Sequence, residues 1–199
     1  KAVETIKTKD SVSADFQAGL DAYKKGDYET ALKLYRAAAE QGDIMAQFTL
    51  GQVYHRPEKY MKGVTKDDKE AVKWYRLAAE QGHARAQNDL GVMYKKGQGV
   101  TQDYTKAVKW YRLAAEQGDV IAQSYLGYMY TSGKGVIKNL VIAYMWSNIA
   151  ANDGNKGVAG YNHGKKYKSF VERKMTAVEI AEAQKLAREC IEKNYKDCG

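Results

Sequence analysis

The chain has 199 residues, 28% of them charged, and its formal net charge of +8 corresponds to a sequence pI of about 9.2. No apolar run approaches the length of about 18 residues that a membrane-spanning helix needs, so we expect no membrane span. Acidic residues are interspersed among the lysines, which indicates a solvated helical surface. Residues 1–12 are polar and aperiodic, and we expect a flexible N-terminal segment there. The sequence starts at Lys1 and not at a methionine. Removal of a signal peptide and trimming of the chain are the two explanations left open.

After this segment, the sequence repeats itself with a period of 36 residues. The same twelve residues, AVKWYRLAAEQG, stand at 71–82 and at 107–118, and Trp74, Trp110 and Trp146 keep the same spacing. The repetition predicts units at 44–82, 83–118 and 119–154, after a shorter first unit at 13–43. One early unit carries extra residues, which we place in an inserted loop at 55–62 around the chain's only proline, Pro57.

Each unit contains two helical patterns joined by a glycine-rich turn. In one unit, Ala86, Leu90 and Tyr94 recur at four-residue steps on one helical face. Gly91 interrupts this pattern at a cost of about 1 kcal/mol, which predicts that two helices approach where no side chain fits. Stacked helix pairs bury a continuous core, so we predict an all-α fold with the three tryptophans in that core.

The unit resembles the Sel1-like repeat (SLR), a relative of the tetratricopeptide repeat (TPR). The resemblance is carried by Ala86, Leu90, Gly91, Tyr94, Gly97, Gly99, Val100, Ala107, Trp110, Tyr111, Ala114 and Ala115, with their counterparts in the neighbouring copies. The first unit, 13–43, is closer to a TPR. The resemblance implies an α/α solenoid, a right-handed superhelix of helix-turn-helix repeats whose first helices line a concave surface.

Concave positions that differ between the copies are the candidates for partner binding, because the fold does not require one residue type there. They are Met45, Phe48, Gln52, His55, Arg85, Asn88, Val92, Lys95, Ile121, Ser124, Tyr128 and Thr131. We therefore predict a non-enzymatic interaction module or adaptor that binds a peptide or protein in its concave face and is monomeric. Analogy with the family suggests bacterial envelope or host-contact roles.

Two other functions remain open: a peptidoglycan-fragment or β-lactam-binding protein with at most weak hydrolysis, and a purely structural spacer. The motifs Ser-x-x-Lys and Gly-x-Ser-x-Gly are absent. His55, His83 and His163 lie in different units without metal-ligand spacing, so we predict no enzyme, metal or cofactor. His83 occupies the place of Asp43 and Asp119 in the neighbouring copies, which indicates a substitution at a helix start.

Residues 155–199 are interpreted as a degenerate half-repeat followed by a capping helix. The glycines at 154, 157, 160 and 164 indicate a loop, with a short helix near 165–173. Thr176 and Glu179 form a capping-box pattern before the last helix, which we expect to cover the end of the stack. Residues 163–175 contain five lysines or arginines, a candidate contact for an anionic partner. No nucleic-acid-binding motif accompanies them.

Cys190 and Cys198 are the only cysteines. A continuous helix would separate them by about 12 Å, too far for a disulfide, unless the helix ends near Asn194 and the chain folds back. Their spacing resembles that of cysteine pairs in secreted, cysteine-rich Sel1-like proteins. The resemblance implies a disulfide and a periplasmic or secreted protein. The alternative is two free thiols in the cytoplasm.

Overall fold

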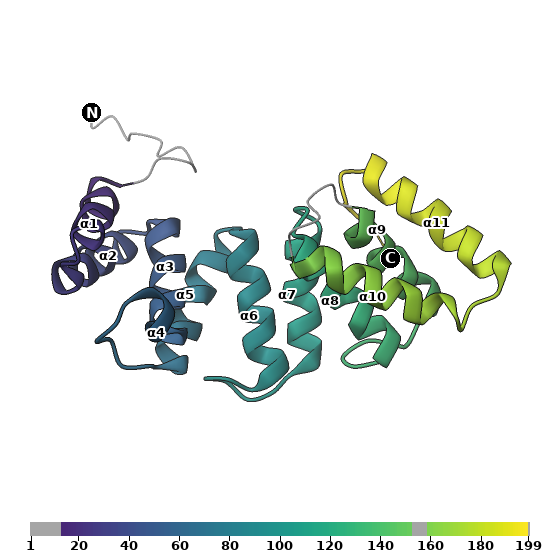
Figure 1. Cartoon of the computed structure of the whole chain (residues 1–199), viewed down its shortest axis with the longest axis horizontal. Coiled ribbons are helices and arrows are strands. Elements are labelled where there is room, and N and C mark those ends of the chain that lie inside the picture. The colour runs from purple at the N-terminus through teal and green to yellow at the C-terminus, as the bar shows by residue number, and fades with distance from the viewer. Residues whose placement is uncertain (1–12, 153–158, 199) are drawn as a thin grey trace, which may run out of the picture. The chain divides into compact units, whose positions relative to one another are not determined.

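The structure is a computed structural model that describes residues 13–152 and 159–198. These residues form eleven helices and no strand, which confirms the predicted all-α class (Figure 1). They divide into two compact units, residues 1–81 and 82–199. Unit 1 contains α1 (Ala14–Lys24), α2 (Tyr28–Glu40), α3 (Ile44–His55), α4 (Pro57–Tyr60) and α5 (Asp68–Glu80). Unit 2 contains α6 (Ala84–Lys96), α7 (Tyr104–Ala115), α8 (Val120–Ser132), α9 (Leu140–Asn152), α10 (Ala159–Glu172) and α11 (Ala177–Glu192).

Consecutive helices pack against each other within each unit, as in an α/α solenoid. In unit 1, α2 packs on α1 and α3, and α5 packs on α3. The insertion at 55–62 is not simply a loop, because Pro57–Tyr60 form the helical turn α4 beside α3. Proline suits the first position of a helix, where no intrahelical partner for its missing N–H exists. Pro57 and Met61 are both buried, so the insertion adds to the core of unit 1.

The glycines inside the first helices are positions of close helix–helix contact, as the sequence predicted. A Cβ atom at Gly91 would lie 2.7 Å from the Tyr111 ring, and one at Gly19 would lie 2.7 Å from the Tyr35 ring. Real Cβ contacts are essentially never that short. A Cβ atom at Gly51 would likewise lie too close to the Tyr75 ring. The repeated glycine and tyrosine are therefore two halves of one packing contact.

Glutamines and arginines of the copied stretches connect successive helix pairs. In unit 2, Gln117 donates a hydrogen bond to Gln87 Oε1 at 2.7 Å, and Gln123 donates to the Ala115 carbonyl at 3.3 Å. Unit 1 has the same bonds from Gln81 to Gln47 and from Gln47 to Ala39. Arginine also donates to the tyrosine hydroxyl of the next pair, in Arg36–Tyr54 and Arg112–Tyr130. These bonds give a physical reason for the verbatim repetition.

The prediction that all three tryptophans are buried holds for two of them. Trp74 and Trp146 are buried, whereas Trp110 is partly exposed. Trp146 lies on α9, which packs against α8, α10 and α11, while Trp110 lies on α7, which packs mainly against α6 and α8. The number of neighbouring helices does not explain this difference, because Trp74 is buried on α5, whose main neighbour is α3 alone.

The segment after the repeats contains a longer helix than the sequence predicted. Instead of a short helix near 165–173, α10 begins at Ala159 and includes Gly160 and Gly164. A Cβ at Gly160 would lie 2.6 Å from the backbone at Val120, and one at Gly164 would lie 2.8 Å from Ala150. These two glycines permit close packing of α10 on α8 and α9, which is why a loop was wrongly inferred. Residues 153–158, with the other two glycines, lie outside the described residues, as do residues 1–12.

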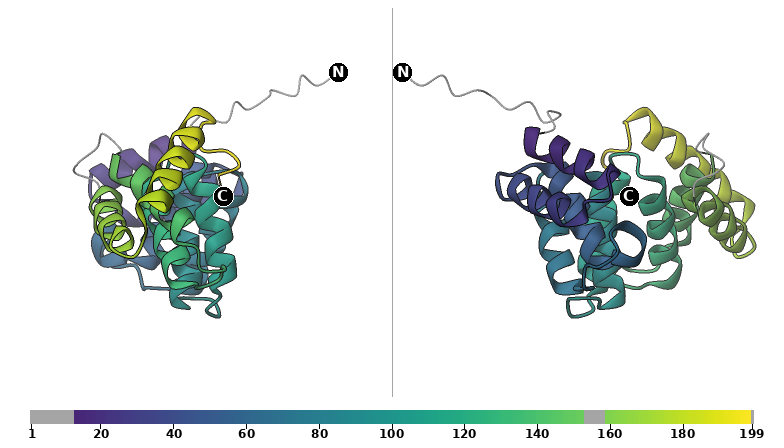
Figure 2. Two further views of the ribbon diagram at one scale, coloured as in Figure 1. Left: turned by 90° about the vertical axis from the view of Figure 1, so that its right-hand side faces the viewer. Right: turned by 60° about the vertical axis from the view of Figure 1, so that its left-hand side comes forward.

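The C-terminal helix begins where predicted. Thr176 and Glu179 form the reciprocal capping box, with Thr176 N donating to Glu179 Oε2 at 2.7 Å. Ala183, Ala187 and Cys190 form its buried stripe. Figures 1 and 2 show α10 and α11 at the C-terminal end of unit 2, where α11 packs on α9. The helix thus covers α9 as a capping helix should.

His83 is the N-cap residue of α6, as its alignment with two aspartates predicted. Its Nδ1 accepts a hydrogen bond from Ala86 N at 3.1 Å, matching the bonds of Asp43 and Asp119 at their own helix starts. Burial, with the charge of Arg85 as a smaller cause, lowers the pKa of His83. The cap therefore requires the neutral imidazole, because a protonated Nδ1 cannot accept a hydrogen bond.

This cap should make the stability of unit 2 depend on pH. Because the pKa of His83 is lower in the folded chain than its ordinary 6.5, its contribution is complete above pH 6.5 and declines as pH falls through the folded pKa. We expect His83→Ala to cost about 1 kcal/mol at pH 7.5. His83→Asn should keep the cap and flatten the profile. Urea unfolding from pH 5 to 8 measures both, and an unchanged profile in His83→Asn would contradict the assignment.

Candidate functional site

Three of the four predicted concave positions of unit 1 have partners within the unit. The Phe48 ring is buried 6.1 Å from the Tyr75 ring, and Gln52 donates to the Tyr60 hydroxyl at 3.2 Å. His55, also buried, lies with Nδ1 2.7 Å from Asp68 Oδ1. Met45 is exposed. Since Tyr60 belongs to α4, the insertion itself occupies part of this surface.

The corresponding positions of unit 2 divide into closed and accessible ones. Asn88 and Ser124 are buried, and the Ser124 hydroxyl donates to the Ile121 carbonyl at 2.7 Å. The Thr131 hydroxyl donates to the Gly127 carbonyl at 2.6 Å. Arg85 is exposed, and the remaining partly exposed positions are Ile121, Val92, Lys95 and Tyr128. The structure therefore brings together a smaller candidate surface on α6 and α8.

Lys95 and Tyr128 belong to a group of aromatic and cationic side chains, which we call the Lys95 cluster: Lys95, Tyr125, Tyr128 and Tyr167. The Lys95 Nζ lies 4.0 Å from the Tyr125 ring centroid and 5.9 Å from that of Tyr128. The Tyr128 and Tyr167 rings are 5.6 Å apart. Three helices thus contribute, α6 through Lys95, α8 through two tyrosines and α10 through Tyr167. Such cation–π contacts position an ammonium group while leaving its N–H donors available.

The electrostatics of the cluster are those of a partly desolvated cation. Burial lowers the pKa of Lys95, and the positive charges of Lys96 and Lys134 act in the same direction. In residues 13–152 and 159–198, no carboxylate lies within salt-bridge distance of Lys95, although other lysines have one, such as Lys106 with Asp103 at 3.3 Å. Burial also raises the pKa of Tyr167. The cluster is therefore a positive site lined by tyrosine rings.

The sequence comparison named Lys95 and Tyr128 as candidates and did not single out Tyr125 or Tyr167. Tyr125 lies beside the aligned positions, where Thr49 and Asp89 stand in the other repeats, so its variation was an available signal. Tyr167 follows the repeats, and no alignment of copies could place it. The basic segment 163–175, noted as a candidate anion contact, overlaps α10 and so lies beside this cluster.

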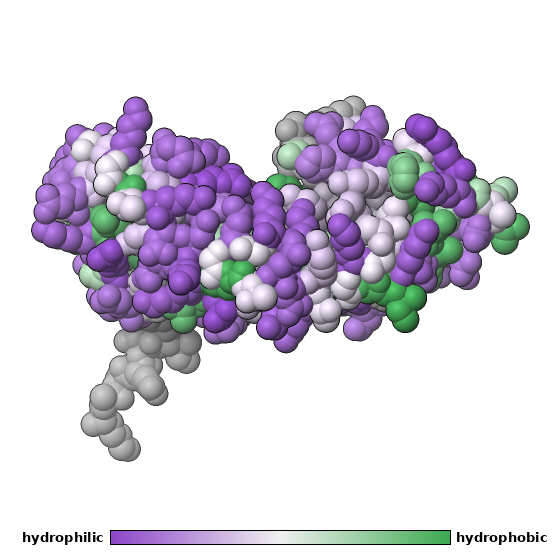
Figure 3. All heavy atoms as spheres, turned by 90° about the horizontal axis from the view of Figure 1, so that it is seen from below, coloured by the Kyte–Doolittle hydropathy of each residue, from purple (hydrophilic) through white to green (hydrophobic). Residues whose placement is uncertain are grey.

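Metal-ligand groups and membrane-spanning helices are both absent from the residues that the structure describes. They contain no group of three or more His, Cys, Asp or Glu side chains placed to hold a metal ion. None of their helices is both long and apolar enough to cross a membrane. Figure 3 shows a mostly hydrophilic face on which hydrophobic residues form small groups. The exposed hydrophobic side chains of Ile137 and Val178 lie apart in sequence, in the α8–α9 connection and on α11 respectively.

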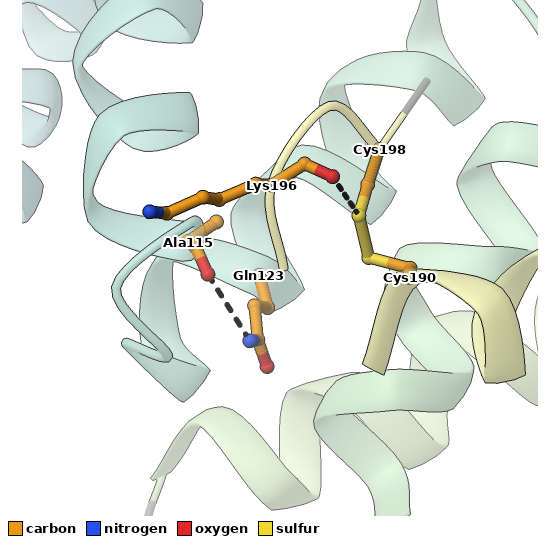
Figure 4. The surroundings of a disulfide bond; sticks show 5 residues. All are labelled: Ala115, Gln123, Cys190, Lys196 and Cys198. Atoms are coloured by element: carbon orange, nitrogen blue, oxygen red, sulfur yellow. Dashed lines mark hydrogen bonds between the residues drawn. A yellow bond between two sulfur atoms is a disulfide. The ribbon is translucent and has the colours of Figure 1, made fainter. Parts of the chain in front are cut away.

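The two cysteines form the disulfide that the resemblance implied (Figure 4). Their Cα atoms are 5.4 Å apart because α11 ends at Glu192 and the chain folds back. Asn194, Tyr195 and Asp197 have left-handed backbone conformations in this turn. Lys196 O lies 3.4 Å from Cys198 Sγ. A Cβ at Gly118 would be 3.4 Å from the Tyr195 ring, so the C-terminal turn lies against the α7–α8 connection.

Comparison with known proteins agrees with this architecture. The model of the Sel1 repeat matches residues 16–43, 44–83, 84–119 and 120–155. Among solved structures, a Sel1 repeat protein from Oxalobacter formigenes is 33% identical, with a TM-score of 0.66 over 89% of this chain and 72% of that one. No curated protein matches the sequence significantly.

A second similar structure is c5321, a protective antigen present in uropathogenic Escherichia coli strains and displaying an SLR fold. It is 30% identical, with a TM-score of 0.61 over 93% of this chain. The present chain spans 46% of that protein. The similarity therefore confirms the resemblance to Sel1-like repeats and the solenoid class, and it concerns about half of the antigen.

Proposed function

The chain belongs to the Sel1 repeat family, whose members are generally protein-interaction modules, and we propose that it is a non-enzymatic adaptor for a peptide or protein partner. The partner segment lies along α6, α8 and α10 of unit 2, and the chain acts as a monomer. The observation that supports this proposal is the Lys95 cluster, which presents tyrosines and a cation on packed helices. Rigid aromatic side chains supply contact area at low entropic cost.

The same proposal includes an oxidising compartment, the bacterial periplasm or the exterior. The Cys190–Cys198 disulfide supports it, because such bonds persist mainly outside the cytoplasm. A cytoplasmic protein would instead have both thiols reduced. Nothing in the described residues favours the peptidoglycan-fragment or β-lactam alternative, and nucleic acid is not the proposed partner.

We expect the purified chain to select peptides from a phage-displayed library of random dodecapeptides. The double substitution Val92→Asp and Tyr128→Ala should lower the affinity for the selected peptides at least about tenfold, because both side chains lie on the proposed surface. Lys109→Ala, an exposed position on α7, is the matched control and should bind as the wild type does. Fluorescence anisotropy with synthetic peptides measures both, and circular dichroism verifies folding. If the wild type selects no peptide above background, the peptide-binding proposal is abandoned.

A further inference from the structure

The side chains at equivalent positions of the three Sel1-like units differ in their ionic and hydrogen-bond partners. The equivalent residues are His55, Lys95 and Thr131, each four residues after the glycine of the repeated Leu-Gly. His55 has its carboxylate, Asp68, at 2.7 Å, and Thr131 donates to a backbone carbonyl. The Lys95 Nζ has neither a carboxylate within salt-bridge distance nor a hydrogen-bond acceptor in the described part of the chain. The repeat that carries Lys95 thus lacks, within the described residues, the internal carboxylate partner that the His55 repeat supplies.

The surroundings of Lys95 increase its preference for an anion. Its side chain is only partly exposed, so water compensates its charge incompletely, and Lys96 and Lys134 add positive potential. The neighbouring α10 contributes Lys165, Lys166 and Lys168 against one acidic residue, Glu172. Tyr167, the α10 member of the cluster, lies among these lysines in sequence. A positive potential therefore extends from Lys95 toward α10.

Resting on the proposed function, we propose that the partner segment is an acidic peptide, with an aspartate or glutamate carboxylate bound by the Lys95 ammonium group beside the tyrosines of α8. The carboxylate takes the place beside Lys95 that Asp68 has beside His55 in its own repeat. The tyrosines contact the apolar part of the peptide, and the lysines of α10 attract further acidic residues. Charge-assisted hydrogen bonds formed away from bulk water are the stronger kind, so this contact contributes affinity and selects the partner.

The arrangement favours a peptide over a nucleic acid. Single-stranded nucleic acids bind through bases stacked on exposed aromatic faces, along a cationic groove that tracks the backbone. Here the Tyr125 ring is covered by the Lys95 ammonium group, and the Tyr128 and Tyr167 rings pack on each other. Lysine is a compact point charge and fits one carboxylate well. The side chains of the cluster therefore suit an acidic side chain between tyrosines better than a stacked base.

The test compares wild type, Lys95→Met and the matched control Lys96→Met, which removes the same charge from the adjacent exposed position. Each full-length protein selects from the random dodecapeptide library, and the selected peptides are synthesised with their carboxylates and with Asn and Gln in place of Asp and Glu. We expect wild type and Lys96→Met to enrich acidic residues and to lose at least about tenfold in affinity on amide replacement, equal to about 1.4 kcal/mol. For Lys95→Met the loss should be under about twofold. Lys95→Gln repeats the comparison if Lys95→Met folds poorly.

The outcomes separate this inference from the proposed function. Selection of peptides without acidic enrichment, or equal amide effects in wild type and Lys95→Met, overturns the acidic-peptide inference and leaves peptide binding in place. Selection of no peptide overturns both. A twelve-residue oligothymidine that binds the wild type more tightly than the best acidic peptide, and competes with it, assigns the site to nucleic acid and also overturns the inference. Weaker binding of the acidic peptides at higher salt is expected.

Discussion

Gly91→Ala is expected to destabilise unit 2 by up to about 2 kcal/mol, although alanine is the better helix former. The added Cβ would lie 2.7 Å from the Tyr111 ring and 3.2 Å from the Ala107 carbonyl oxygen. Tyr111 is fully buried, so its ring cannot turn out into solvent to relieve the contact. Overpacking a dense core costs about 1–3 kcal/mol or more, and the gain of about 1 kcal/mol in helix propensity offsets only part of it. Urea unfolding monitored by circular dichroism measures the difference.

The control removes the ring that causes the clash. The fourth repeat has serine at the corresponding place, since Ser147 stands opposite Gly127. Tyr111→Ser alone should cost several kcal/mol because it leaves a large cavity. In that background, we expect Gly91→Ala to cost much less or to stabilise the protein. A double-mutant cycle gives the coupling, which should exceed about 1 kcal/mol. Simple additivity of the two substitutions would show that the Gly91–Tyr111 contact is not the cause.

This contact illustrates what the sequence could predict. Because each copy of the unit makes the same packing contacts, a glycine at the same helical position in every copy indicates a recurring close contact. This inference does not require knowledge of the partner ring. The N-cap role of His83 was predictable for the same reason, because the other copies show aspartate there. The capping box of α11 depends on residues three apart, Thr176 and Glu179, and needs no tertiary information.

The wrong or missing predictions concern contacts between segments that are not related by the 36-residue period. Gly160 and Gly164 look like loop glycines, and only the approach of α10 to α8 and α9 shows that they serve packing. Trp110 has the same local sequence as Trp74 and differs in exposure, so local sequence cannot decide its burial. Tyr167 joins the Lys95 cluster across helices far apart in sequence. The candidate site therefore needed the structure, while the fold did not.

Removing the disulfide is expected to destabilise unit 2 by about 2 kcal/mol and to lower its melting temperature by about 4–8 °C. The bond closes a short loop between Cys190 and Cys198, so its loss restores conformational freedom to the unfolded chain. In the folded chain, it holds the turn that places Tyr195 against Gly118. Cys190→Ala with Cys198→Ala and reduction of the wild type by dithiothreitol should give similar shifts.

Two controls distinguish this cause from general damage. The double alanine variant should not respond to dithiothreitol, because it has no bond to reduce. Hydrogen exchange should rise first in α11 and the turn after it, and the amides of α1–α5 should keep their protection because they belong to unit 1. Protein from its own host should take up alkylating reagent at both cysteines only after reduction. Labelling without reduction would show free thiols, and the proposed oxidising compartment would then have to be replaced by the cytoplasm.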